Sequence, residues 1–222
     1  MNKKIRKFIK LAEGRSDVYK FLSFVYSKPS KEFVDKIKES KFLSIETAEL
    51  EEFEVEYTRL FAASGEHYIP PYESVYKDKW TIDYVGMPHL GLPPRREVVE
   101  GLLWGDSTVA VQKKYRKAGL EVSENDREIP DHISVELEFM HYLCGKEAEA
   151  WKSGNKSEAV KYLEMQKEFL NEHLAAWVEK FCTKVEERAQ YDFYRIMARL
   201  TREYVRLEQA EIESFIENAK LL

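Results

Sequence analysis

The sequence predicts an all-α protein, a single-domain bundle of about ten helices, on the strength of three observations. Apolar residues recur at helical spacing in most segments, no segment alternates convincingly at period two, and one proline- and tyrosine-rich stretch interrupts the pattern. The chain has 222 residues, of which 44% are hydrophobic and 34% charged. Because a chain of this length buries roughly 70% of its unfolded surface, residues 1–222 are expected to form one domain.

The helices are expected from their apolar spacing, in order along the chain. The first three lie near 3–13, 17–27 and 31–39, with Ser16 and Ser30 as N-caps. Later helices follow from four apolar series: Leu50, Phe53, Tyr57, Leu60 and Phe61; Ile133, Leu137, Met140, Cys144, Ala148 and Trp151; Leu174, Trp177, Val178, Phe181, Cys182 and Val185; and Tyr194, Met197, Leu200, Tyr204, Leu207 and Phe215. No sheet is expected.

Residues 64–95 depart from the helical pattern and hold five of the seven prolines. They also hold a series of aromatic residues, Tyr68, Tyr72, Tyr76, Trp80 and Tyr84. Long structureless connections are uncommon in compact domains, and disordered linkers are poor in aromatic residues. We therefore expect a long ordered excursion whose tyrosines pack against the helices.

The composition excludes several classes of protein. A net charge of −5 argues against general nucleic-acid binding. No segment approaches the roughly 20 apolar residues of a membrane span, so stable membrane insertion is not expected. The basic start, residues 1–7, is followed by charged residues rather than an apolar stretch, which indicates a cytoplasmic location. Cys144 and Cys182 form no CxxC pair and are expected as reduced core thiols.

Signatures of common enzymes are missing from the sequence. It contains no glycine-rich phosphate loop, no GxSxG elbow and no HExxH pair. Glu138 and His141 form one Glu-x-x-His element of the kind that helps hold two irons inside helical bundles, but a second such element is missing. We expect no cofactor. A metal-binding helical-bundle oxidoreductase using Glu138 and His141 stays open as an alternative, as does a helical adaptor for an unrelated peptide.

Negative charge is concentrated between residues 120 and 138. This segment carries a net charge of −6, from Arg127 and the acidic residues Glu121, Glu124, Asp126, Glu128, Asp131, Glu136 and Glu138. The helix expected to begin at Asp131, which would cap it, has a second stripe about 90° from its core stripe. This second stripe runs from polar to apolar and consists of His132, Glu136, Phe139 and Leu143. It is either a boundary packed on a neighbouring helix or a groove for a ligand with a cationic part followed by an apolar part.

Two motifs resemble the signatures of the TorD/DmsD-type redox-enzyme maturation chaperones. The first is PPYESVY at 70–76, preceded by EYTRLF at 56–61, and the second is EIPDH at 128–132, continued by ELEFM at 136–140. Other positions fit the family's helices, namely Arg15, Tyr19, Leu22, Tyr26, Pro29, His173, Leu174, Trp177, Phe181, Phe193 and Tyr194. The resemblance spans residues 15–205.

The resemblance implies an all-helical cytoplasmic protein without enzymatic activity. Such a chaperone binds the twin-arginine signal peptide of a molybdopterin oxidoreductase catalytic subunit, assists cofactor insertion and delays export. Members of the family it resembles exchange elements between subunits, so the resemblance leaves both a monomer and a domain-swapped homodimer open, with 120–130 as the candidate hinge. Carried over by position, the family's leader-binding residues are Asp131 and His132, and its proline-tyrosine loop is Pro71, Tyr72, Glu73 and Ser74. The predicted peptide-binding set adds Glu128, Glu136, Phe139 and Leu143.

Overall fold

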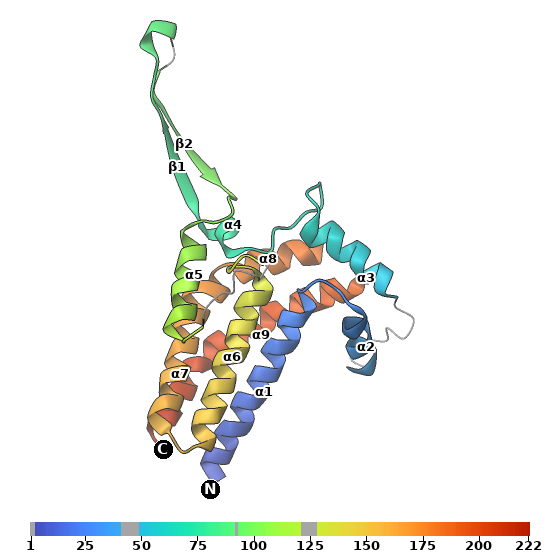
Figure 1. Cartoon of the computed structure of the whole chain (residues 1–222), viewed down its shortest axis with the longest axis vertical. Coiled ribbons are helices and arrows are strands. Elements are labelled where there is room, and N and C mark those ends of the chain that lie inside the picture. The colour runs from blue at the N-terminus through green and yellow to red at the C-terminus, as the bar shows by residue number, and fades with distance from the viewer. Residues whose placement is uncertain (1–2, 41–48, 92, 121–127) are drawn as a thin grey trace.

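The computed structural model describes residues 3–40, 49–91, 93–120 and 128–222 (Figure 1). Most of these residues are helical. The α-helices are α1 (Lys3–Val25), α2 (Lys31–Ser40), α3 (Leu50–Tyr57), α4 (Glu73–Lys77), α5 (Asp106–Lys117), α6 (Ile133–Lys152), α7 (Lys156–Phe169), α8 (Ala175–Arg188) and α9 (Asp192–Lys220). Short π-helical segments η1 (Thr58–Ala62) and η3 (Leu170–Leu174) continue α3 and join α7 to α8, and a 3-10 turn η2 spans Pro88–Leu90. The all-α prediction is confirmed for the bundle.

The long helices pack side by side around one hydrophobic core. Helix α6 lies between α1 and α7, and α9 packs against both α7 and α8. Large aromatic side chains fill the core, and among those fully buried are Trp177, Tyr19, Tyr26, Phe33 and Phe53. None of the helices in the described ranges is long and apolar enough to cross a membrane.

The expected break between helices 3–13 and 17–27 is wrong, because α1 runs through it. Ser16 is not an N-cap: its hydroxyl lies 2.8 Å from Nδ1 of His141 on α6 and donates to the His141 carbonyl at 3.0 Å. Its neighbour Arg15 is buried between Glu147 and Glu208, at 3.2 and 2.7 Å. These tertiary contacts hold the helix continuous. Ser30, by contrast, caps α2 as predicted, accepting from the Phe33 amide at 3.2 Å.

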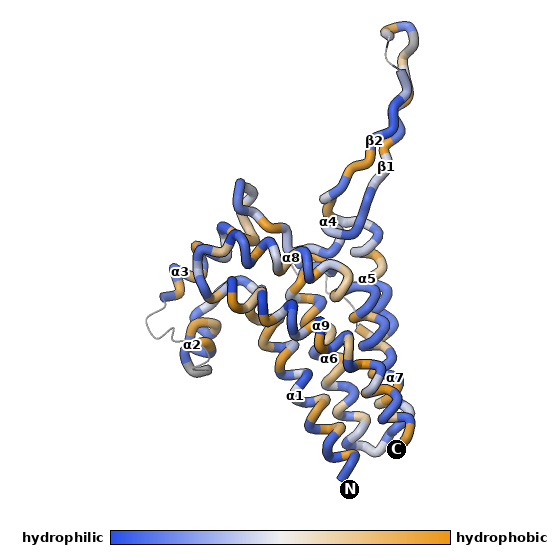
Figure 2. The backbone as a smooth tube through the Cα atoms, turned by 180° about the vertical axis from the view of Figure 1, so that it is seen from behind, coloured by the Kyte–Doolittle hydropathy of each residue, from blue (hydrophilic) through white to orange (hydrophobic). Residues whose placement is uncertain are grey.

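The expectation of no sheet is wrong for the excursion. Strands β1 (Lys79–Tyr84) and β2 (Arg95–Glu100) pair antiparallel, with Lys79 opposite Glu100 and Tyr84 opposite Arg95. The six residues of β1 do alternate polar and apolar, but this run is too short to stand out among the prolines and aromatic residues around it. We call residues 79–100 the arm. It projects from the end of the bundle in both the front and the rear view (Figures 1 and 2).

The tyrosines of the excursion divide between the bundle and the arm. Tyr76 stacks on Trp177 of α8, with ring centroids 5.3 Å apart, and Tyr72 is half-buried. Trp80 and Tyr84 stand on the arm and are 44% and 39% exposed. The excursion therefore packs on the helices only up to α4, and beyond that point it leaves them.

Candidate functional site

The two motif segments, 70–76 and 128–132, pair with each other at the end of the bundle that carries the arm. Tyr72 and His132 form an isolated antiparallel β-bridge. On either side of it, the Ile133 amide donates to the Pro71 carbonyl at 2.9 Å, and the Glu73 amide donates to the Asp131 carbonyl at 3.0 Å. We call this pairing, with the side chains it positions, the motif junction.

Asp131 is fully buried and does not cap α6, contrary to expectation. Its Oδ2 atom accepts a hydrogen bond from the Ser74 amide at 2.8 Å, at the first turn of α4. A carboxylate at a helix start satisfies an otherwise unpaired amide and is favoured there by the helix dipole. Asp131 therefore holds the proline-tyrosine loop to the second motif, while its other oxygen, Oδ1, is buried without a hydrogen-bond partner among the described residues.

His132 takes the N-cap position of α6. Its Nδ1 atom accepts from the Ser134 amide at 3.2 Å and lies 2.7 Å from the Ser134 hydroxyl. Burial lowers the pKa of His132 to about 3, because a charged imidazole would lose its hydration there. The ring is therefore neutral at physiological pH, and its Nε2 atom lies 3.9 Å from Glu128.

Glu73 connects the junction to η3. It is fully buried, lies 3.0 Å from Nδ1 of His173 on η3 and forms an ion pair with Lys77. Burial would raise the pKa of Glu73, but the hydrogen bonds and charges of His173 and Lys77 outweigh it and lower the pKa. Glu73 is thus a charged group with two partners, and it ties α4 to η3.

Glu136 lies near Glu73, and of these two buried carboxyl groups Glu136 is the one that stays protonated and neutral. Burial, and then the nearby charge of Glu73, raise the pKa of Glu136 well above its ordinary value. Two carboxyl groups at one buried site cannot both ionise cheaply, so one of them keeps its proton. The indole Nε1 of Trp177 donates to Glu136 Oε2 at 3.1 Å.

The apolar half of the second stripe packs on neighbouring helices. Phe139 is 4% exposed, and its ring lies 4.6 Å from Tyr115 of α5 and 4.7 Å from Phe169 of α7. Leu143 is completely buried. In this structure the stripe is a boundary between helices, so the groove interpretation would require α5 or α7 to move.

Only part of the acidic segment reaches the surface. Glu128 and Glu138 are exposed, whereas Asp131 and Glu136 are buried. Glu121, Glu124 and Asp126 lie outside the described residues, as does most of the candidate hinge at 120–130. Among the described residues, the surface of the junction includes the half-buried Tyr72 and the exposed Glu128 near it, above a buried polar network.

Sequence reasoning assigned no place at the site to three residues that hold this network, namely His173, Trp177 and Tyr115. The Tyr115 hydroxyl donates to the Pro130 carbonyl at 2.9 Å, which fixes the start of the second motif. His173 and Trp177 stand four residues apart, so they share one helical face. Two side chains with polar ring nitrogens, four residues apart within an apolar stripe, were the sequence signal that buried hydrogen-bond acceptors lie opposite them.

The metal-binding alternative gains no support from the geometry. Glu138 is exposed, and Nδ1 of His141 is occupied by Ser16 of α1. Within the part of the chain that the structure describes, no group of three or more histidine, cysteine, aspartate or glutamate side chains could hold a metal ion.

Comparisons with known proteins agree on one family. A family model described as the nitrate reductase delta subunit matches residues 26–183. The selenate reductase assembly chaperone protein of Thauera selenatis is 41% identical over 66 residues, which are 30% of this chain and 33% of that protein. The chaperone protein TorD of Shewanella pealeana is 27% identical over 163 residues, which are 73% of this chain and 62% of that protein. The alignments thus span less than two thirds of these relatives' own length.

A solved structure is similar over most of its length. It is a protein of Archaeoglobus fulgidus assigned as a redox enzyme maturation protein, with 25% sequence identity and a TM-score of 0.56. The alignment covers 86% of this chain and 93% of that one.

Proposed function

The chain belongs to the nitrate reductase delta subunit family, and we propose that it is a cytoplasmic chaperone, without catalytic activity, for the catalytic subunit of a molybdopterin oxidoreductase. Two named relatives, the selenate reductase assembly chaperone and TorD, are chaperones by their descriptions, which supports this role. The proposed partners are the subunit's twin-arginine signal peptide, the immature subunit itself and a second copy of this chain. The protein would guard the subunit during cofactor insertion and delay its export.

The motif junction is the proposed binding site for the signal peptide. One observation carries this assignment: segments 70–76 and 128–132, far apart in sequence, form a single backbone-paired unit through Tyr72 and His132. A twin-arginine leader is a basic head followed by an apolar stretch. The exposed carboxylates of Glu128 and Glu138 would attract the head, and charge attraction of this kind contributes to encounter rate and register.

The buried members of the predicted set have a different task in this structure. Asp131 holds the loop to the second motif, Glu73 ties α4 to η3 and Glu136 ties α6 to α8, and these contacts position Tyr72. For the apolar stretch of a leader to reach Phe139 and Leu143, the junction has to open. Burial of apolar peptide surface would then supply most of the affinity.

Calorimetric titration with a synthetic leader peptide tests the proposal. The probe is a synthetic twin-arginine leader of a molybdopterin oxidoreductase catalytic subunit, and its control has both arginines replaced by glutamine. We expect the natural peptide to bind at least tenfold more tightly, since charge-assisted hydrogen bonds are worth about 1.5–3 kcal/mol each. The affinity should fall modestly with added salt, because exposed charges are screened. Equal binding of both peptides would contradict a site that reads the basic head.

A further inference from the structure

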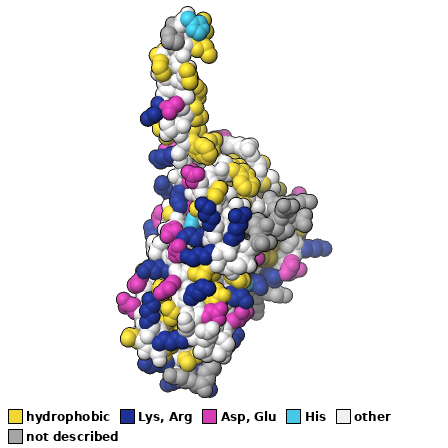
Figure 3. Space-filling view, turned by 60° about the vertical axis from the view of Figure 1, so that its left-hand side comes forward, with side chains coloured by type: hydrophobic (Ala, Val, Ile, Leu, Met, Phe, Trp, Pro, Cys, Tyr) yellow, Lys and Arg dark blue, Asp and Glu magenta, His cyan; other side chains and the backbone are white. Residues whose placement is uncertain are grey.

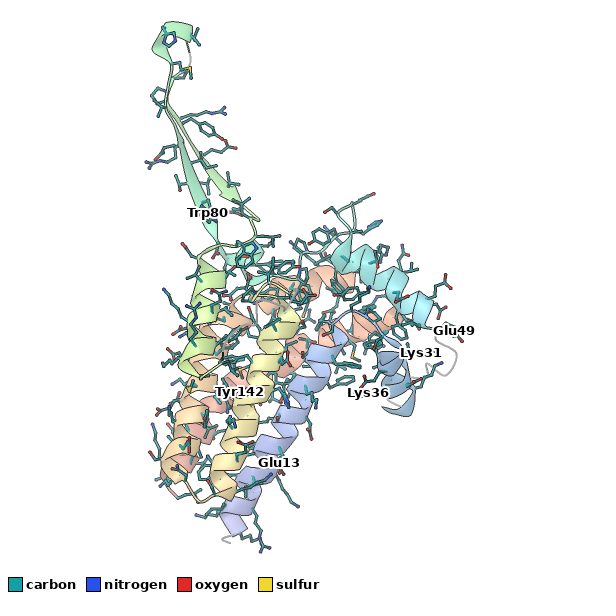
Figure 4. The ribbon with its side chains drawn as sticks, viewed as in Figure 1. Glu13, Lys31, Lys36, Glu49, Trp80 and Tyr142 are labelled. Carbon is teal, nitrogen blue, oxygen red and sulfur yellow. The ribbon has the colours of Figure 1, made fainter. Side chains whose placement is uncertain are left out.

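The first strand of the arm, β1, is amphipathic, whereas β2 places the charged Glu97 and Arg95 on the Trp80 side and Val98 on the Lys79 side. Cross-strand neighbours in the arm's register share a face, so Trp80, Ile82 and Tyr84 stand on one side and Lys79, Thr81 and Asp83 on the other. On the polar side, Lys79 pairs with Glu100 and Asp83 with Arg96, each at 2.7 Å. The apolar side is open to solvent: Trp80, near the base of the arm in Figure 4, is 44% exposed and Ile82 is 39% exposed. Figure 3 shows hydrophobic side chains along one border of the arm and gathered at its base.

The arm leaves backbone groups unpaired as well as side chains uncovered. Its sheet has only β1 and β2 among the described residues, so each strand pairs along one edge alone. A two-stranded ribbon is marginal by itself in water, and further strands with a shared apolar face stabilise it. Exposed strand edges are also the usual templates for pairing with another chain.

The base of the arm is nevertheless fixed to the bundle. Asp78, directly before β1, accepts hydrogen bonds from the Ser107 amide at 2.9 Å and from the Ser107 hydroxyl at 2.5 Å, at the start of α5. The chain therefore presents this ribbon in a set direction.

We propose that two copies of this chain associate through their arms, with β1 pairing antiparallel to β1 of the second copy about a two-fold axis at Thr81. The sequence of β1 is complementary to itself in this register. Lys79 of one copy lies opposite Asp83 of the other, twice by symmetry, and Trp80 lies opposite Ile82. On the polar side, the order Glu100, Lys79, Asp83, Arg96 across the four strands alternates in sign throughout.

Other registers lack this match. A shift by one residue places Trp80 opposite Asp83 and mixes the two faces. An axis at Ile82 keeps the faces but sets Asp83 opposite Thr81, which forms no ion pair. Pairing through β2 about Val98 also sets opposite charges together, Arg96 against Glu100, but it sets Glu97 opposite Val99 on the apolar side. The pattern of β1 alone therefore favours a second copy over an unspecified extended peptide.

The same register also brings together the remaining exposed apolar residues at the tip and base of the arm. It sets Tyr84 of one copy opposite residue 78 of the other, so each tip runs past the base of the partner arm. The tip exposes Val85, Met87 and Leu90, and the base exposes Leu102, Leu103 and Trp104. Association would thus bring two uncovered apolar groups to the same place.

Two double variants test the pairing while preserving each internal ion pair. Lys79→Glu with Glu100→Lys sets a carboxylate at position 79 against Asp83 of the second copy. Asp83→Lys with Arg96→Glu sets an ammonium group at position 83 against Lys79 of the second copy. Each variant alone should raise the dimer dissociation constant about tenfold or more, because like charges then meet twice at the interface.

A mixture of the two variants provides the rescue. At equimolar concentrations it restores opposite charges at both contacts, so it should form a heterodimer close to wild-type affinity. Sedimentation velocity over a concentration series measures the wild type, each variant and the mixture. Circular dichroism of each variant verifies that the bundle stays folded.

The outcomes are decisive in both directions. A dimeric wild type, two weakened variants and a rescued mixture would establish the register. A wild type that remains monomeric throughout the series would overturn the proposal, as would variants that dimerise as strongly as wild type. A monomer whose arm variants lose only binding of the catalytic subunit would assign the arm to the client and equally overturn it.

Discussion

Tyr72 and His132 pair across an antiparallel backbone bridge, and their ring centroids lie 5.2 Å apart in an edge-to-face arrangement. One ring is half-buried and the other almost completely buried, so the pair joins the surface of the junction to its interior. This contact explains why two short motifs separated by more than fifty residues belong to one signature. Each is one side of the same backbone pairing.

Replacement of Asp131 separates its hydrogen bond from its charge. Asp131→Ala removes the acceptor of the Ser74 amide and leaves that buried donor unpaired, which should cost about 2–3 kcal/mol of unfolding free energy. Asp131→Asn keeps an acceptor oxygen at the same position and should cost clearly less. Urea unfolding of both variants measures the difference. Equal losses would show that the hydrogen bond is not what holds the loop.

Glu136 should make the protein less stable as pH rises. Its folded pKa is raised above the ordinary 4.5, so its stabilising contribution is complete below about pH 4.5 and is lost as pH climbs toward the folded pKa. Glu136→Gln cannot ionise, yet it keeps an acceptor for Trp177. The variant should therefore gain stability relative to wild type as pH increases above about 4.5. A difference in unfolding free energy that stays constant with pH would refute a protonated Glu136.

His132, by contrast, should make the protein less stable as pH falls. Its folded pKa of about 3 lies below the ordinary 6.5, so the unfolded chain takes up the proton first as pH falls. Below about pH 6.5 this residue should reduce stability by about 1.4 kcal/mol per pH unit. His132→Asn retains a side-chain acceptor for the N-cap and lacks the titration. Denaturant titrations of both proteins between pH 7 and pH 4 should diverge, and parallel curves would show that the imidazole is not held neutral.

Gly105 keeps the arm seated against α5. A Cβ atom at this position would lie 1.9 Å from Asp78 Oδ2, so Gly105→Ala forces Asp78 away from Ser107. We expect faster amide exchange at the start of α5 and along β1, while the helices of the bundle keep their protection. Gly65→Ala is the matched control, since nothing lies within 4 Å of the added carbon. Unchanged exchange in the Gly105 variant would mean that the Asp78 contact does not hold the arm.

Much of the bundle is predictable from the sequence because burial at helical spacing is a local signal. The apolar series from Ile133 and from Leu174 are both buried faces of real helices, α6 and the η3–α8 segment. The arm was hidden because a six-residue alternation has few repeats to detect. The role of Asp131 was hidden for another reason: its partner, Ser74, is far away in sequence, so a local cap was the natural prediction.

The candidate site was predictable as a set of positions but not as an arrangement. Pro71, Tyr72, Glu73, Ser74, Asp131 and His132 do meet at one place. Their burial was not foreseen, because charge counting treats Asp131 and Glu136 as solvent-facing anions. Their partners come from elements whose placement only the packed fold defines.

Photo-crosslinking from position 72 tests the central claim most directly. A photoreactive phenylalanine derivative replaces Tyr72 in one variant and Leu207, which is 57% exposed on α9, in a control. With a labelled twin-arginine leader peptide, we expect a crosslink from position 72 that excess unlabelled leader suppresses, and none from position 207. Calorimetry on the same two proteins verifies that each still binds the peptide. A peptide that binds both proteins yet crosslinks only from position 207, or from neither, would contradict the motif junction as the site of leader recognition.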